Sequence, residues 1–189
     1  MGFVATRGGN RYLVFRGTHN IREWIYDANI GLVDYPYLPN RGKVHEGFLH
    51  IYERCRADTF TQLEPEFGHD ANFYITGHSL GAALSLLALP DALATGRVKQ
   101  VVLYNFGCPR VGDRTFAAAY NALPGQQSFR LVNTEDLVTL IPLPVHVPVP
   151  IFGGGYFTHV DVPVHFTDQT DTLESNHAME TYLKTLLAL

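Results

Sequence analysis

The sequence is poor in cysteine, with Cys55 and Cys108 as the two in 189 residues. Two cysteines cannot build a disulfide framework, so we expect the fold to depend on a hydrophobic core. Charge is also sparse: 17% of residues are charged, the formal net charge is -4, and no run of like charge is present. These features exclude the basic footprint of a nucleic-acid-binding protein and a polybasic membrane patch.

Long hydrophobic runs are lacking as well. The apolar segment 81–89 is too short to cross a bilayer, and we expect it to end at Pro90 and Asp91, so no transmembrane segment is predicted. The first fifteen residues show neither the basic segment nor the long apolar run of a signal peptide. If the chain is complete as given, the expected location is cytoplasmic; the sequence does not otherwise determine it.

Apolar spacing predicts strands that alternate with helices through the middle of the chain. The expected strands cover 2–6, 11–15, 72–76, 101–106 and 128–133, with an irregular β segment at 156–166. The expected helices cover 19–27, 48 to near Pro65, 80–89, 113–123 and 176–187. Asp113 is the expected N-terminal cap of the fourth. This alternation is typical of an α/β domain, here a single domain over 1–189 with a mainly parallel sheet flanked by helices.

The segment Gly77-His78-Ser79-Leu80-Gly81 lies between a predicted strand and a predicted helix, which is the context that a G-x-S-x-G nucleophile elbow requires. A sharp strand-to-helix turn forces the serine into a strained conformation and brings strand and helix close together, so that glycines are needed on either side. We therefore predict that Ser79 is a nucleophile. The backbone N–H of Leu80 would then donate to the oxyanion.

A serine nucleophile needs a base, and the base needs a group that holds it in one tautomer. With this elbow, the acid and the histidine follow the serine along the chain. Asp136 comes after the predicted strand 128–133 and is the expected acid, with neighbouring Glu135 as its rival. His177, at the start of the last predicted helix, is the expected base, and His159 and His165 remain alternatives.

Six segments in the same order resemble conserved blocks of the class 3 lipases, the fungal-type triacylglycerol lipases. The segments are Phe15 to Thr18, Val44 to Phe48, Gly77 to Gly81, Phe106 to Gly112, Val132 to Asp136, and Asn176-His177 with Tyr182-Leu183. The resemblance implies an α/β-hydrolase fold that is N-terminally short, since typical members carry a segment before the first strand pair. It also implies a serine carboxylic ester hydrolase that needs no cofactor or metal.

The resemblance further implies roles around the nucleophile. Thr18 would be the second oxyanion donor. The helix expected at 19–27, with Trp24 on its apolar face, would be a lid that contacts a lipid interface transiently, although a fixed surface helix has the same pattern. Four residues would line the substrate groove: Val138, Ile141, Pro142 and Ala178.

Several functions share this set of residues. The favoured substrates are acylglycerols or other lipid esters. A short-chain or feruloyl-type esterase, a phospholipase A1 and a catalytically silent interaction module on a lipase fold are the alternatives. A metal site around His159 and His165 is disfavoured, because a spacing of six matches no common ligand pattern.

Overall fold

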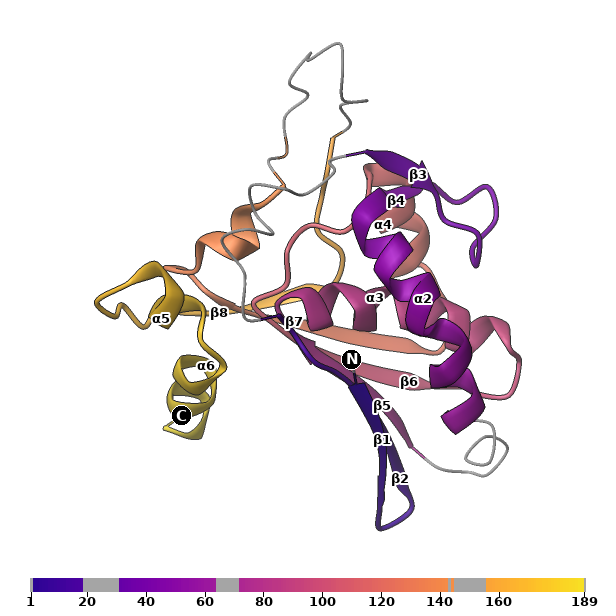
Figure 1. Cartoon of the computed structure of the whole chain (residues 1–189), viewed down its shortest axis with the longest axis horizontal. Coiled ribbons are helices and arrows are strands. Elements are labelled where there is room, and N and C mark those ends of the chain that lie inside the picture. Colours follow the sequence, from indigo (N-terminus) through magenta and orange to yellow (C-terminus); the bar gives the residue numbers. More distant parts are fainter. Residues whose placement is uncertain (1, 19–30, 64–71, 143, 145–155, 189) are drawn as a thin grey trace.

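The computed structural model describes residues 2–18, 31–63, 72–142, 144 and 156–188. Its centre is a six-stranded sheet with the strand order β1-β2-β5-β6-β7-β8 (Figure 1). Strands β1 (Gly2–Arg7) and β2 (Asn10–Phe15) are antiparallel, and all later neighbours are parallel. This confirms the predicted α/β class with a mainly parallel sheet.

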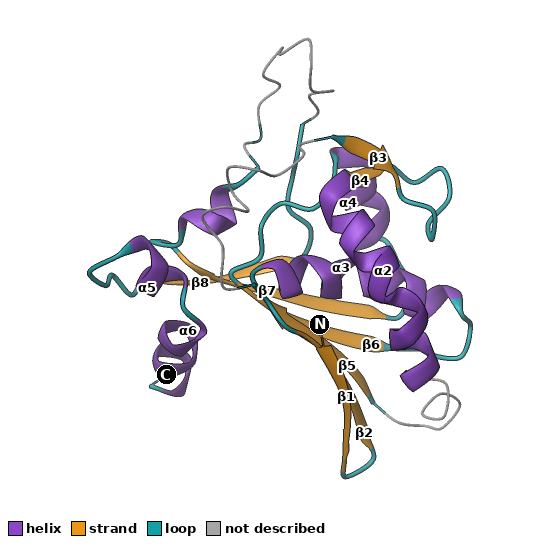
Figure 2. Ribbon diagram, viewed as in Figure 1, coloured by secondary structure: helices purple, strands orange, loops and turns teal. Residues whose placement is uncertain are grey.

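The remaining strands of the sheet are β5 (Phe73–His78), β6 (Val101–Phe106), β7 (Gln126–Asn133) and β8 (Val162–Phe166). Because these strands are parallel, their carboxyl ends lie along one edge of the sheet, where loops lead away from them (Figure 2). All three proposed catalytic residues follow strands at this edge.

Helix α3 (Leu80–Ala94) packs between the sheet and α2 (Glu46–Leu63), and α4 (Arg114–Asn121) lies on the same side (Figure 1). Residues 80–92 of α3 are all buried, which explains a sequence that is apolar on every face. The predicted cap of α4 is confirmed, since the Asp113 carboxylate accepts from Phe116 N at 2.7 Å. On the other side of the sheet, α6 (Met179–Leu187) packs its Tyr182 ring against Phe106 and Phe166.

Two helix predictions were wrong. Helix α3 continues through Pro90 to Ala94, because the proline removes only its own N–H donor while the buried residues around it keep their packing. The expected helix 176–187 is split at Ala178 into α5 (Leu173–His177) and α6. His177 therefore ends α5 and does not open the last helix.

A small antiparallel sheet was not predicted: β3 (Leu32–Asp34) pairs with β4 (Lys43–His45) next to α2. Three residues per strand are too few to give a clear alternation in the sequence. The helix expected at 19–27 lies outside the described residues.

Candidate active site

Ser79 lies at the turn from β5 into α3 and has φ 61 and ψ -126. This confirms the strained conformation that the motif predicts. A Cβ on Gly77 would lie 2.2 Å from the carbonyl oxygen of Gly81, and a Cβ on Gly81 would lie 2.3 Å from that of Phe15. Both glycines are therefore required by the close approach of strand and helix. Ser79 itself is 1% exposed.

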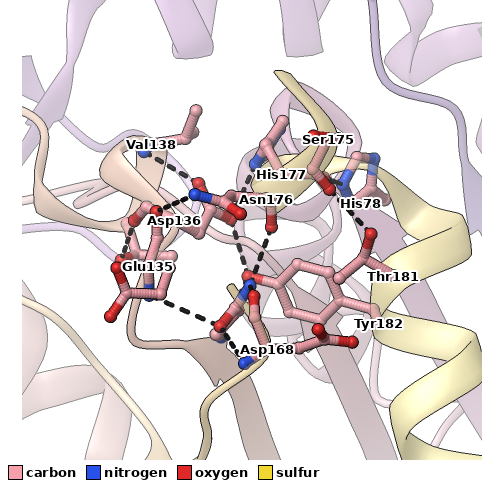
Figure 3. Close-up of polar contacts among 12 residues, drawn as sticks. His78, Glu135, Asp136, Val138, Asp168, Ser175, Asn176, His177, Thr181 and Tyr182 are labelled. Carbon is pink, nitrogen blue, oxygen red and sulfur yellow. Dashed lines mark hydrogen bonds and ion pairs between the residues drawn. The ribbon is translucent and has the colours of Figure 1, made fainter. Parts of the chain in front are cut away.

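Asp136 follows β7 and forms the N-cap of a short 3-10 helix, η2 (Leu137–Leu140). Its Oδ1 accepts from the backbone N–H of Val138 at 2.9 Å. Its Oδ2 accepts from His177 Nδ1 at 2.7 Å and from the Tyr182 hydroxyl at 2.6 Å (Figure 3). The carboxylate is fully buried and accepts from three donors, and its bond to His177 Nδ1 holds the His177 ring in one tautomer.

The other ring nitrogen of His177, Nε2, is also buried. Among the buried side-chain atoms of the described residues, His177 Nε2 and Ser79 Oγ both lack a hydrogen-bond partner. With the proton on Nδ1 directed at Asp136, Nε2 carries the lone pair that can accept a proton. The arrangement leaves Ser79, the predicted nucleophile, and His177, the predicted base, each with an unused hydrogen-bonding atom.

Tyr182 bonds to Asp136, the predicted acid, and the sequence argument from motif order did not find this contact. Its hydroxyl donates to Asp136 and accepts from the backbone N–H of Asn133 at 3.2 Å. Burial, and then the charge of Asp136, raise the pKa of Tyr182 far above its usual range. The hydroxyl thus remains protonated and acts as a permanent donor.

Gly107 makes room for the Asp136–His177 pair and was also missed. Its φ is +56, and a Cβ there would lie 2.9 Å from Asp136 Oδ2 and 2.9 Å from His177 Cε1. The signal was available in the sequence, since Gly107 directly follows β6 at the edge where reactive groups gather.

The alternatives for acid and base lie elsewhere. The backbone carbonyl of Glu135 accepts from Asn176 Nδ2 at 3.2 Å, and the carboxylate that contacts His177 belongs to Asp136. His159 is bonded through Nε2 to the carbonyl of Thr139 at 2.8 Å, and burial lowers its pKa to about 3. His165 is exposed on β8.

The two predicted oxyanion donors are Leu80, inside the elbow, and Thr18, on the segment that follows β2. Leu80 is the first residue of α3, where backbone N–H groups have no acceptor within the helix. Thr18 follows Gly17, and a Cβ on Gly17 would lie 3.3 Å from Ser79 Cβ. The segment that carries Thr18 therefore passes close to the nucleophile, while its role as a donor stays a prediction.

The predicted groove residues are near the acid and the base. Val138 and Ile141 belong to η2 and its C-cap, and the carbonyl of Pro142 accepts from Arg110 Nη1 at 2.9 Å. Ala178 separates α5 from α6. Their contact with substrate remains a prediction, and Trp24 lies outside the described residues. In the described part of the chain, no His, Cys, Asp and Glu cluster could hold a metal ion, and no helix is long and apolar enough to cross a membrane.

The fold is the α/β-hydrolase fold, with its serine elbow and a buried Asp–His pair at the carboxyl edge of a parallel sheet. Comparison with known proteins gives the family: residues 12–146 match Lipase (class 3). A lipase of Rhizomucor miehei is 34% identical over 84% of this chain and 42% of its own length. The chain belongs to the class 3 lipase family.

Two further proteins, one compared by sequence and one by its solved structure, are also similar to this chain. A phospholipase A1-II 1 of Oryza sativa subsp. indica is 31% identical over 73% of this chain and 43% of its own. The solved structure of lipase II from Rhizopus niveus aligns with a TM-score of 0.73 and 31% identity, over 88% of this chain and 62% of that one. The chain thus spans less than half the length of these sequence relatives.

Proposed function

We propose that this chain is a serine carboxylic ester hydrolase that acts through an acyl-enzyme, with Ser79 as nucleophile, His177 as base and Asp136 as acid. The observation that carries the proposal is the buried hydrogen bond from His177 Nδ1 to Asp136 Oδ2. It fixes the tautomer in which His177 Nε2 can take the Ser79 proton. The strained elbow and family membership support the same assignment.

The chemistry follows from these groups. His177 Nε2 takes the proton of Ser79 Oγ while Oγ attacks the ester carbonyl carbon, and the carbonyl oxygen becomes an oxyanion held by the N–H groups of Leu80 and Thr18. When this intermediate collapses, the His177 proton passes to the leaving alcohol and the acyl group stays on Ser79. Water, deprotonated by His177, then attacks the acyl carbon. The bond to Ser79 Oγ breaks, the His177 proton returns to Oγ, and the carboxylic acid is released.

The proposed substrates are acylglycerols or other lipid esters, reached through transient contact with a lipid interface. Relatives named lipase favour acylglycerols, and the rice relative named phospholipase A1-II 1 makes a phospholipid the second candidate. Val138, Ile141, Pro142 and Ala178 would line the acyl groove. Initial rates on soluble short-chain esters, emulsified acylglycerols and phosphatidylcholine vesicles, measured side by side, would separate these substrates.

Labelling with a fluorophosphonate tests the proposal directly. The reagent should modify wild-type protein at Ser79 and should fail on Ser79→Ala, and ester hydrolysis should be lost with it. His177→Ala should lose nearly as much, because the members of a triad act as a unit. Retained turnover in His177→Ala together with loss in His159→Ala or His165→Ala would reassign the base. Absence of labelling in wild type would favour a silent interaction module.

A further inference from the structure

The last carbonyl groups of α5 are held by side chains from three other elements. The pairs are Ser175 O with Thr181 Oγ1 at 2.7 Å, Asn176 O with Asn133 Nδ2 at 3.0 Å, and His177 O with His78 Nε2 at 2.7 Å. The last carbonyls of a helix lack partners within it, and these three side chains supply donors to them. Figure 3 shows His78 and Thr181 beside His177.

His78 is the donor that connects the base to the nucleophile. It is the last residue of β5 and is covalently bonded to Ser79, and its ring centroid lies 4.5 Å from that of His177. The Tyr182 ring also packs near His78, with its centroid 6.0 Å from that of His78. A single hydrogen bond therefore ties the backbone of His177 to the residue that precedes Ser79.

The protonation of His78 follows from this bond. A carbonyl oxygen only accepts, so Nε2 must carry a proton. Burial, and then the neighbouring His177, lower the pKa of His78 to about 4. At neutral pH the His78 ring is thus an uncharged Nε2–H tautomer. It donates a hydrogen bond without placing its own positive charge beside His177.

We propose that His78 is a positioning residue for the base: its Nε2–H fixes the backbone of His177 relative to Ser79, while Asp136 fixes the ring. The inference rests on the proposed function of Ser79 and His177. Without His78, the bond to Asp136 still sets the tautomer, but α5 and α6 lose a direct link to the elbow. A displacement of about 1 Å in a catalytic group costs up to roughly 100-fold in rate.

Two substitutions distinguish the effect of the His78 N–H from the effect of its aromatic ring. His78→Phe keeps an aromatic ring for Tyr182 and removes the N–H, whereas His78→Gln keeps an N–H at a similar reach. We expect His78→Phe to lower kcat on a soluble ester about 10-fold to 100-fold at nearly constant KM. His78→Gln should recover to within about threefold of wild type. His50→Gln, an exposed histidine on α2, is the control and should leave the rate unchanged.

Proton NMR adds a readout that does not depend on turnover. The Nδ1–H of His177, bonded to Asp136, should give a far-downfield resonance, and His78→Phe should shift or broaden it while His78→Gln restores it. Equal rates in wild type and His78→Phe would overturn the inference, and so would equal loss in His78→Phe and His78→Gln with an unchanged resonance. If wild type neither turns over nor is labelled, the proposed function fails, and the resonance still reports on the position of His177.

A measurement on the wild-type protein stands even where His78→Phe does not fold. Nitrogen-15 NMR of the histidine rings distinguishes the Nε2–H tautomer, the Nδ1–H tautomer and the cation. We expect His78 as neutral Nε2–H at pH 7. An Nδ1–H tautomer at that pH would contradict the anchoring bond, and a cation would contradict an uncharged donor.

Discussion

Gly107 and Ser79 both have a positive φ, for different physical reasons. At Ser79 the value of 61° arises because a strand must turn directly into a helix. At Gly107 the value of 56° carries the chain past the Asp136–His177 pair, whose atoms occupy the space that a side chain would need. In the proposed site, Ser79 provides the reactive atom, and Gly107 provides the room in which Asp136 and His177 meet.

Gly107→Ala should therefore impair the site more than the fold. A Cβ at 2.9 Å from Asp136 Oδ2 and His177 Cε1 forces the pair to move, and we expect kcat to fall at least about tenfold. Gly8→Ala is the matched control, because Gly8 has φ +55 and no neighbour within 4 Å of its Cβ position. Gly8→Ala should lose about 1 kcal/mol of stability from backbone strain, and Gly107→Ala should lose more, because the crowded pair must also shift. Steady-state kinetics with denaturant melts checks both; equal activities in the two variants would contradict the crowding argument.

At the scale of elements, α3 carries the elbow and is fixed against α2 by a buried carboxylate. Asp91 accepts from Arg56 Nε at 2.6 Å and Nη2 at 2.9 Å, and from the Tyr52 hydroxyl at 2.7 Å. The Arg56 guanidinium also stacks over the Tyr37 ring at 4.2 Å. Asp91 lies in the extension of α3 beyond Pro90, so this interaction stabilises the part of the helix that was not predicted.

Arg56→Met should leave the Asp91 carboxylate buried without its cation. We expect a loss of roughly 2–4 kcal/mol in the free energy of unfolding, at the lower end of the range because Arg56 is 35% exposed. Arg56→Met with Asp91→Asn should recover part of it, since no buried charge remains. Urea melts measure both, and Arg54→Met, an exposed arginine on the same helix, is the control. A loss no larger than in Arg54→Met would show that the pair contributes little.

Over the whole molecule, buried ionisable groups link stability to pH in two opposite ways. Burial lowers the pKa of His45 to about 4, of His78 to about 4 and of His159 to about 3, from an ordinary value of 6.5. The contribution of these histidines to the free energy of unfolding is complete above pH 6.5 and is lost as pH falls toward 4. Over that interval the unfolded chain binds protons that the folded chain does not bind. Burial raises the pKa of Asp161 from 3.8 to about 7, so its contribution is lost as pH rises over that interval.

Near pH 5, unfolding should therefore take up three protons on these histidines and release one from Asp161. The net uptake of about two protons makes stability rise by roughly 2.7 kcal/mol per pH unit. Asp161→Asn removes the opposing group, and the slope should steepen by about one proton, or roughly 1.4 kcal/mol per pH unit. Melts at closely spaced pH values between 4.5 and 6.5 give both slopes. Identical slopes in the two proteins would show that Asp161 is ionised in the folded state.

Features that arise from local geometry were predictable from the residues alone. The elbow at Ser79 was predictable because a strand, a tight turn and a helix are each encoded by neighbouring residues, and the positions of Gly77 and Gly81 follow from it. The parallel sheet was predictable because strands and helices alternate. The acid and base could be proposed from their order along the chain. Asp136 and His177 were therefore candidates before any contact between them was known.

Contacts between residues far apart in the chain were visible only in the folded molecule. Tyr182 bonds to Asp136, His78 to the carbonyl of His177, and Arg56 to Asp91, across 46, 99 and 35 positions. No periodicity records such pairs, because packing of whole elements brings them together. The same packing carries α3 past Pro90, since residues buried on every side offset the one donor that proline removes.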